Sequence, residues 1–594
     1  MPLTRRPRSG VHGVHGVHGN HGVRDVQAVR GVHDDFQTGR PRRPAAAMVG
    51  LAVAVAIGFG SRGVAAERQV LLTAACDSYG DLKKQLGWLG PQIDNPGLAG
   101  MLESVLLLAT QGRGLAGLDV KRPLGIVVSS DGADVAIHGF VPVKDLDKLL
   151  TSLQGVTGPV ETDGATRRVT LPSGIPLEIT ERAGWAVIAP AGMAAAPADP
   201  APLLEAVTKD CSLGLEAFPG RMPEAVREQF AAAVAQGMAA AAPDQPPDPD
   251  AVRVAIEGLR QTESLSLGVA IDPETDSVFV ENRSVMMPGS AAAAALAAAG
   301  GGAATVGLPA ASDGKQPAIR GHLVQAVSEA AGKRTIESLE QALPPDGGDR
   351  LTETISRVLR DIIAAMVASG GVDAAFAVDT AAASDDSPLP AVTAGVRVKD
   401  GAALERQLKK LLAADGSKPK AVDVRFDTGR VGDASLHTVA IDIADLPAAE
   451  RFGKRIDLTL ATAPGYAFVL AGGDPKTRVA AALEASGRAN PAAKPIAGME
   501  VAMDRVLAYA AARDAAPELA AAAERAAGAE SSRLLVSVQP IDRGVATRLS
   551  ADAGALKAMA TLGGGAAGPA GPAGVPLPPL QRIPNGFPVP VPTP

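Results

Sequence analysis

One order of strand and helix signals occurs twice along this chain, and this repetition constrains the fold more than any other feature. The segment VPVKD at 141–145 matches VRVKD at 396–400. Each final aspartate suits a helix N-cap, because its carboxylate can accept hydrogen bonds from the amides of the first turn. Leucines four and eight residues after each aspartate give the helix one apolar stripe; they are Leu149, Leu153, Leu404 and Leu408. Each copy therefore predicts a strand that leads into an amphipathic helix.

Three further landmarks follow in the same order in both halves: an apolar strand, a strand before a helix, and a hairpin before an Ala-rich helix. The matched segments are 184–189 with 465–471, 212–216 with 497–501 (before helices at 223–240 and 502–513), and 265–280 with 534–549 (before helices at 290–299 and 552–561). Four landmarks in one order are hard to obtain by chance. We therefore expect a first lobe at 67–300, a linker at 301–319, a second lobe at 320–562, and a disordered Gly/Pro-rich tail at 563–594.

Strands in this chain occur mainly as hairpins. One example is 124–130 with 134–141, which flank the turn formers Asp131 and Gly132. Hairpins indicate a largely antiparallel sheet, so the expected fold class is α+β rather than doubly wound α/β. An apolar helical face that runs from Leu351 to Met366 opens the second lobe. The sequence thus predicts two tandem homologous lobes of mainly antiparallel sheet with packed amphipathic helices.

The first 66 residues carry the features of export. Residues 1–43 form a basic leader rich in His and Gly, which is expected to be disordered. Positive charge, an uncharged apolar run and small residues follow in the order of a secretory signal at 44–66, with cleavage after Ala66. The same run is also long enough for a retained single-span anchor. Both alternatives predict an exported protein of the periplasm or cell envelope, which contacts the membrane only if this segment is uncleaved.

The chain has two cysteines, Cys76 and Cys211. An oxidising compartment outside the cytoplasm would permit one disulfide between them. The alternative is two buried free thiols. Because they form no CxxC motif, a thioredoxin-like site or a zinc knuckle is not expected.

Motifs of familiar chemistry are absent from the sequence. It contains no P-loop, HExxH or GxSxG, and GxGxxG at 112–117 has a helix before it where a dinucleotide site needs a strand. Beyond the leader the histidines are His138, His322 and His437, and no two share a helix face at ligand spacing. The net charge of −7 and the 3% aromatic content disfavour nucleic-acid binding. We therefore predict no catalytic residue, cofactor or metal site.

LAGLDVKRPLG at 115–125, followed by a strand and the Asp131-Gly132 pair, resembles a pattern in uncharacterised exported proteins of planctomycete bacteria. SYGDL at 78–82 fits the same pattern. The resemblance covers about the first 120 residues after the apolar segment well, and the rest loosely. It implies export and a duplicated α+β body, and it implies no activity.

Three functions are compatible with these features. The first is a non-enzymatic envelope or periplasmic protein that binds an unknown ligand or envelope component between its duplicated lobes, because a cleft between similar lobes is a natural binding place. The second is a hydrolase with an unrecognised active site, which predicts a pocket with a titratable group of shifted pKa. The third is a passive structural protein of the envelope.

Overall fold

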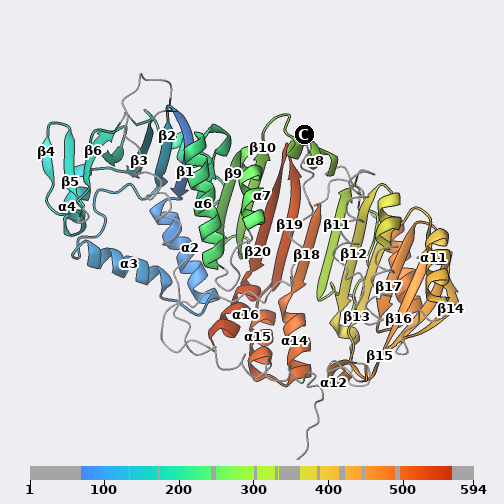
Figure 1. Cartoon of the computed structure of the whole chain (residues 1–594). Coiled ribbons are helices and arrows are strands. Elements are labelled where there is room, and N and C mark those ends of the chain that lie inside the picture. Colours follow the sequence, from blue (N-terminus) through green and yellow to red (C-terminus); the bar gives the residue numbers. More distant parts are fainter. Residues whose placement is uncertain are drawn as a thin grey trace, which may run out of the picture.

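The computed structural model describes residues 68–564, apart from 133, 172–173, 194–195, 242–248, 300–303, 328–331, 333–361, 384–387, 414–421, 445–448 and 489–495. Its centre is one antiparallel sheet of twenty strands with helices around it (Figure 1). The expected α+β class is therefore confirmed. The leader, the apolar segment with Ala66, and the tail from residue 565 lie outside the described residues. No helix in the described part combines the length and hydropathy that a bilayer span requires.

The strands of the second half follow the order of the first half across the sheet. In sheet order the first half has β4 (Glu161–Asp163), β5 (Thr166–Thr170), β6 (Pro176–Arg182), β7 (Trp185–Pro190), β3 (Val135–Pro142), β2 (Leu124–Ser130), β1 (Gln69–Cys76), β8 (Leu213–Ala217), β9 (Thr262–Asp272) and β10 (Ser277–Met286). The second half has β14 (Val422–Val431), β15 (Ala434–Asp442), β16 (Arg455–Ala463), β17 (Tyr466–Ala471), β13 (Ala391–Arg397), β12 (Gly371–Asp379), β11 (Ile319–Ala326), β18 (Ala497–Ala502), β19 (Arg533–Ile541) and β20 (Gly544–Asp552). Adding ten to each strand number converts the first order into the second.

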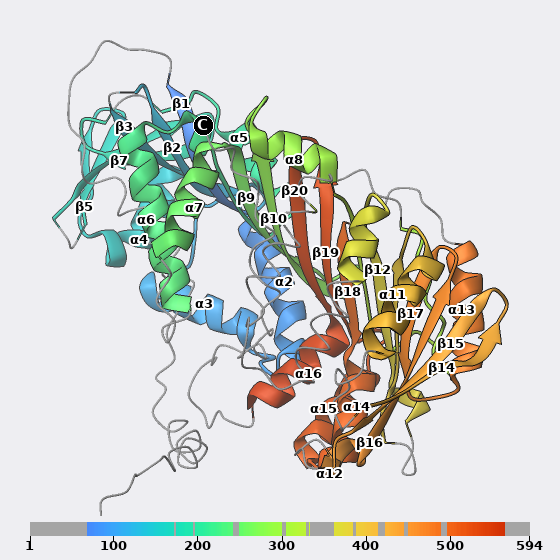
Figure 2. The same ribbon diagram turned by 45° about the vertical axis from the view of Figure 1, so that its right-hand side comes forward.

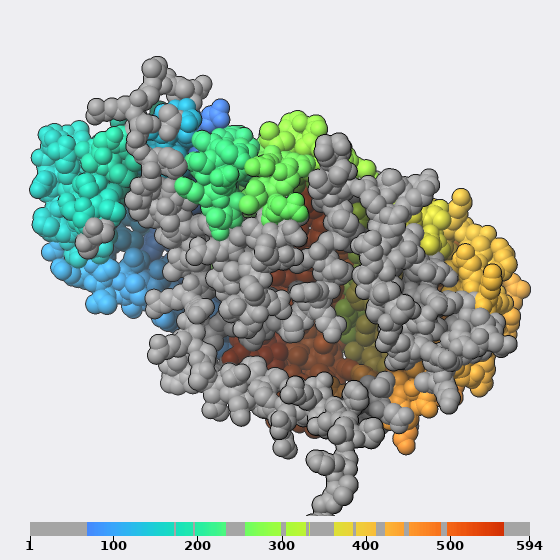
Figure 3. All heavy atoms as spheres, viewed as in Figure 1, coloured from blue at the N-terminus to red at the C-terminus, as the bar shows by residue number. Residues whose placement is uncertain are grey.

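The two halves meet edge to edge where β10 pairs with β20, from Ser277 opposite Asp552 to Val285 opposite Gly544. The sheet is therefore continuous through the middle of the molecule. The outer strands β4 to β6 lie at one end and β14 to β16 at the other, as the teal and orange ends of the space-filling view show (Figure 3).

One row of directly paired residues crosses all twenty strands, and we call it the transverse row. From β4 to β10 its members are Asp163, Thr166, Thr180, Val187, Phe140, Gly125, Ala75, Gly214, Gly268 and Glu281. From β20 to β14 they are Arg548, Ser537, Gly498, His322, Ala375, Gly395, Phe468, Ala461, Leu436 and Gly429. Directly paired residues share one face of a sheet. Because the two halves also have the same strand order, the row sets equivalent positions of the two halves side by side.

Thirteen α-helices have both ends among the described residues. They are α2 (Tyr79–Gln92), α3 (Leu98–Ala109), α4 (Leu146–Thr157), α5 (Ala201–Thr208), α6 (Glu224–Ala241), α7 (Pro249–Arg260), α8 (Ala291–Ala299), α11 (Gly401–Ala413), α12 (Ala449–Phe452), α13 (Pro475–Gly487), α14 (Met503–Asp514), α15 (Pro517–Ala527) and α16 (Ala553–Gly564). Helices α14, α15 and α16 pack on one another beyond one end of the central strands, where α16 contacts α2 (Figure 2).

Neighbouring residues of β7 and β17 identify the face that each helix covers, because successive side chains of a strand point to opposite faces. Ala186 packs in a cluster with α4, whereas Val187 packs in a cluster with α5. Likewise Ala467 packs with α11, and Phe468 packs with α13. Since Val187 and Phe468 both belong to the transverse row, α5 and α13 lie on one face of the sheet, and α4 and α11 lie on the other.

The predicted hairpin and the two predicted helix caps are confirmed. β2 and β3 form the expected hairpin. The Asp145 carboxylate accepts a hydrogen bond from the Lys148 amide at 3.0 Å, and Asp400 accepts one from the Ala403 amide at 2.9 Å, so both aspartates cap their helices. Of the amphipathic helix expected from Leu351 to Met366, residues 351–361 lie outside the described part, and 362–368 are helical.

Residues 304–318, within the expected linker, lie against β12. The Thr305 amide donates to Asp373 Oδ2 at 2.7 Å, and the Ser312 amide donates to Asp379 Oδ2 at the same distance. Val306 is buried in the cluster that contains Phe468. The described part of this segment is therefore packed on the sheet, and it contributes to the site below.

The sheet ends in two unlike outer strands. β4 has three residues, and all are exposed. β14 is longer, and its pairing with β15 shifts between Arg425 and Gly429, where Asp427 adopts a left-handed φ of 56°. Such a bulge bends a strand and increases its local twist.

Candidate functional site

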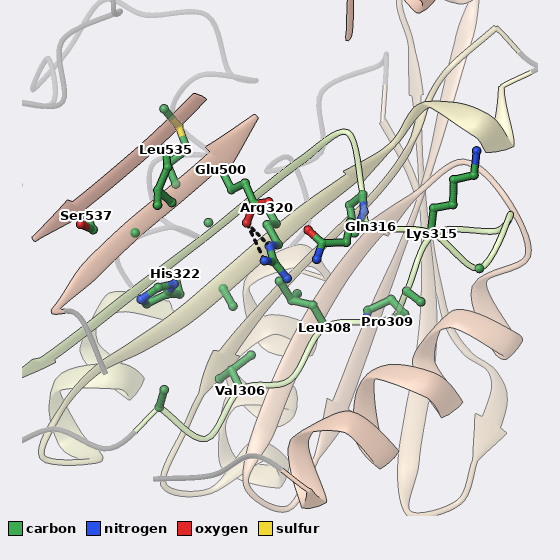
Figure 4. Close-up of a pocket in the computed structure, with 18 of the residues that line it drawn as sticks. Val306, Leu308, Pro309, Lys315, Gln316, Arg320, His322, Glu500, Leu535 and Ser537 are labelled. Carbon is green, nitrogen blue, oxygen red and sulfur yellow. Dashed lines mark hydrogen bonds and ion pairs between the residues drawn. The ribbon is translucent and has the colours of Figure 1, made fainter. Parts of the chain in front are cut away.

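A hollow of about 820 Å³ lies over β11, β18 and β19 of the second half (Figure 4). Its floor is polar and includes Arg320, His322, Glu500 and Ser537. Its wall comes from the packed segment 304–317 and is mainly apolar, with Val306, Leu308 and Pro309. The volume lies within the range of pockets that hold small molecules, roughly 300–1,000 Å³.

An ion pair lies in the floor of the hollow. Arg320 on β11 is directly opposite Glu500 on β18, and its Nε and Nη2 donate to Glu500 Oε2 at 2.9 and 2.5 Å. Figure 4 shows the arginine head group between Glu500 and the wall residue Leu308. On the far side of the carboxylate, Arg533 Nη1 is 3.8 Å from Glu500 Oε1. Glu500 therefore has two cationic neighbours.

The hollow occupies the place that α5 fills in the first half. There, a Cβ added to the row glycine Gly125 would lie 2.7 Å from Leu204 Cδ2, and one on Gly214 would lie 2.3 Å from the carbonyl oxygen of Val207. Helix α5 thus sits directly on β1, β2 and β8. Helix α13 follows β17 as α5 follows β7, but it packs over β14 and β17 instead. Because α13 lies nearer the outer strands, the hollow forms over β11, β18 and β19.

A second polar cluster joins α11 to the β14–β15 hairpin. Lys409 Nζ is 2.7 Å from Glu405 Oε1 and 2.8 Å from Asp427 Oδ1. His437 is 1% exposed, and its Nε2 is 3.7 Å from Glu405 Oε1. Burial lowers the pKa of His437, so this imidazole is neutral near pH 7. Burial opposes ionisation of Glu405, but hydrogen bonds from Lys409 and Thr462 lower its pKa overall.

Glu405, Asp427 and His437 are close enough together to be tested as a metal site. The Asp427 amide donates to His437 Nδ1 at 3.0 Å, so Nδ1 carries the lone pair and Nε2 carries the proton. A metal ion needs a lone pair on its histidine ligand. The Lys409 ammonium also already binds both carboxylates. These donors therefore fit an ion-paired structural cluster rather than a divalent cation.

Of the cysteines and histidines that the sequence analysis named within the described residues, only His322 lines the hollow. Cys76 and Cys211 are free thiols, so the possible disulfide is not formed. Cys76 lies opposite Leu213, whereas the side chain of Cys211 lies over Gly268. Burial, and secondarily Asp77, raises the pKa of Cys76 to about 11.

The other motifs have structural roles. The GxGxxG segment follows the end of α3, and its glycines at 112, 114 and 117 have positive φ, as a helix stop and loop require. His138 is buried in β3, and His437 lies in β15, both in strands as expected.

Sequence reasoning missed Arg320, Glu500 and Ser537. Glu500 lay within a matched landmark, but the register aligns GLE at 214–216 with GME at 498–500, one residue from the sequence match. With that alignment, His322 stands where the first half has Ala75. The sequence signal that could have found the site was therefore the difference in residue type between matched strands of the two halves.

No family model, curated protein or solved structure matches this chain.

Proposed function

We propose that this protein is an exported, non-enzymatic binding protein of the periplasm or cell envelope, and that the hollow holds its ligand. One observation carries the proposal: the second half leaves a hollow open over β11, β18 and β19, where α5 covers the corresponding strands of the first half. Polar floor residues beneath an apolar wall are the usual composition of a small-molecule site. The hollow lies on strands of the second half, near the join of β10 and β20, so the site is not a cleft between facing lobes.

We further propose that the chain arose by tandem duplication of one α+β unit, giving lobes at 67–300 and 320–562. The repeated strand order and the two aspartate caps support this proposal. The transverse row supports it independently, because the row passes through equivalent landmark strands in both halves and centres on Glu281 and Arg548. After duplication, one copy can keep the covered strands while the other acquires a ligand site.

The hydrolase alternative has less support. The cluster of Glu405, Lys409, Asp427 and His437 combines a buried imidazole with carboxylates, as a catalytic group would. However, His437 Nδ1 accepts a hydrogen bond from the Asp427 amide, and Nε2 carries the proton, so neither imidazole nitrogen is positioned to activate a nucleophile. Both carboxylates bind Lys409. We therefore propose that this cluster holds α11 to the β14–β15 hairpin and has no catalytic role.

Native mass spectrometry of the full chain, purified from its own host, tests the proposed function. We expect a small molecule bound at one per chain. Leu535→Trp, which fills the hollow, should remove it, whereas Val280→Trp should retain it. These two positions are a matched pair, since Leu535 is 37% exposed and Val280, outside the hollow, is 38% exposed. A chain that carries no bound molecule, or equal occupancy in both variants, would overturn the proposal and favour a passive structural role.

A further inference from the structure

The floor of the hollow differs in charge from the equivalent strands of the first half. Within the transverse row, His322 and Ser537 replace Ala75 and Gly268. Two residues further along the same strands, the second half has Arg320 opposite Glu500. The first half has Thr73 opposite Glu216 at the equivalent position. The glutamate is therefore present in both halves, whereas the cation Arg320 and the polar side chains of His322 and Ser537 stand only in the second half.

Among the described residues, the charged side chains that line the hollow are Lys315, Arg320 and Glu500, two positive and one negative. Glu500 lies between two arginines, with Arg320 on one oxygen and Arg533 near the other. If Arg320 turns toward a ligand, Glu500 still has the cationic Arg533 at 3.8 Å, and that arginine also donates to Asp552 Oδ2 at 3.1 Å. Arg320 can therefore serve as an anion receptor while Glu500 retains a cation nearby.

The wall of the hollow favours an aliphatic group. Val306, Leu308 and Pro309 line it from the packed segment, and Leu535 lines it from β19. In the first half the corresponding space over the sheet holds the aliphatic side chains Leu204 and Val207 of α5. An aliphatic ligand would therefore bury its chain in the same type of surroundings.

We propose that the hollow binds an amphiphilic anion, whose carboxylate or phosphate group pairs with Arg320 and whose aliphatic chain packs on the wall of residues 306–309. This inference rests on the proposed function, because it names the ligand class of the same site. The planar guanidinium suits both head groups, since it forms paired hydrogen bonds with carboxylates and phosphates alike.

Calorimetric titration of the full chain with probes of one chain length tests the ligand class. The probes are decanoate, decyl phosphate and decyltrimethylammonium, each below its micelle-forming concentration. We expect at least one anion to bind tenfold or more tightly than the cation, and the stronger of the two anions identifies the head group. Leu535→Trp should abolish this binding.

Arg320→Gln should weaken anion binding about tenfold, whereas Arg283→Gln should leave it unchanged. Arg283 is a matched control: it is 46% exposed and 2.5 Å from Glu281, and Arg320 is 44% exposed and 2.5 Å from Glu500. Equal binding of the cation, or anion binding that survives Arg320→Gln, would overturn the ligand class and leave the hollow as a binding site. Failure of all three probes would overturn the ligand class, while native mass spectrometry would still decide the proposed function separately.

Discussion

The pairing of Glu281 with Arg548 at the centre of the sheet gives a direct test of how the two halves are held together. These residues are opposite each other on β10 and β20, at the middle of the transverse row. Glu281 is 8% exposed and accepts hydrogen bonds from Arg548 Nε at 2.6 Å and Arg283 Nε at 2.5 Å. Replacing it with arginine would place two cations opposite each other at the join.

The size of the effect follows from these contacts. A hydrogen bond to a charged group contributes about 1.5–3 kcal/mol, and solvent reduces this value where the arginines are exposed. Arg548 is 40% exposed, so we expect Glu281→Gln to cost about 1–2 kcal/mol of unfolding free energy. Glu281→Arg should cost about 3 kcal/mol, because it leaves Arg548 with a repulsive neighbour. The double variant Glu281→Arg, Arg548→Glu restores an opposite-charge pair and should recover about 1–2 kcal/mol.

Urea unfolding followed by circular dichroism measures these differences, and pH supplies a further check. Burial disfavours ionised Glu281, but its arginine hydrogen bonds lower its pKa overall. A lowered carboxyl pKa stabilises the fold above the unfolded value of about 4.3, and this stabilisation is lost as the pH falls through the folded pKa. The wild type should therefore lose its advantage over Glu281→Gln at low pH. The reasoning would be refuted if the double variant lost as much unfolding free energy as the separate losses of Glu281→Arg and Arg548→Glu added together.

Three further predictions concern packing and thiol chemistry. Leu204→Ala should lower the unfolding free energy by about 2–5 kcal/mol in a denaturant titration, because this side chain of α5 is fully buried against the sheet; a loss below 1 kcal/mol would mean that α5 does not cover the sheet. Gly214→Ala should lower the melting temperature, since its Cβ would lie 2.3 Å from a carbonyl oxygen of α5, whereas Gly258→Ala in the open face of α7 should not; equal effects would contradict the close approach. Thiol titration at pH 8 should find Cys76 slow to react in the folded chain, because burial raises its pKa to about 11, and should find two thiols after unfolding without reductant; fast reaction would contradict the burial of Cys76, and a missing thiol would contradict the two free cysteines.

Local signals in the sequence were sufficient for the elements, but not for the site. Asp145 and Asp400 could be assigned as caps because the amide that each accepts lies three residues away. Arg320 and Glu500 are 180 residues apart, and their meeting depends on the register of β11 with β18. The hollow also depends on where α13 packs, which is decided by contacts with β14 and β17 rather than by the sequence of the helix itself. The sequence left a disulfide and two free thiols open for the same reason, since it is the register that sets Cys76 opposite Leu213.

Among the described strands, β4 and β14 form the two outer edges of the sheet, and such edges influence whether one molecule can add to another. β4 offers three residues, two of them acidic, and β14 is bent by its bulge and carries charged side chains such as Asp423 and Arg425. Short, charged or distorted edges are poor templates for main-chain hydrogen bonding with a second chain. We therefore expect a sheet of twenty strands that disfavours edge-to-edge growth into filaments.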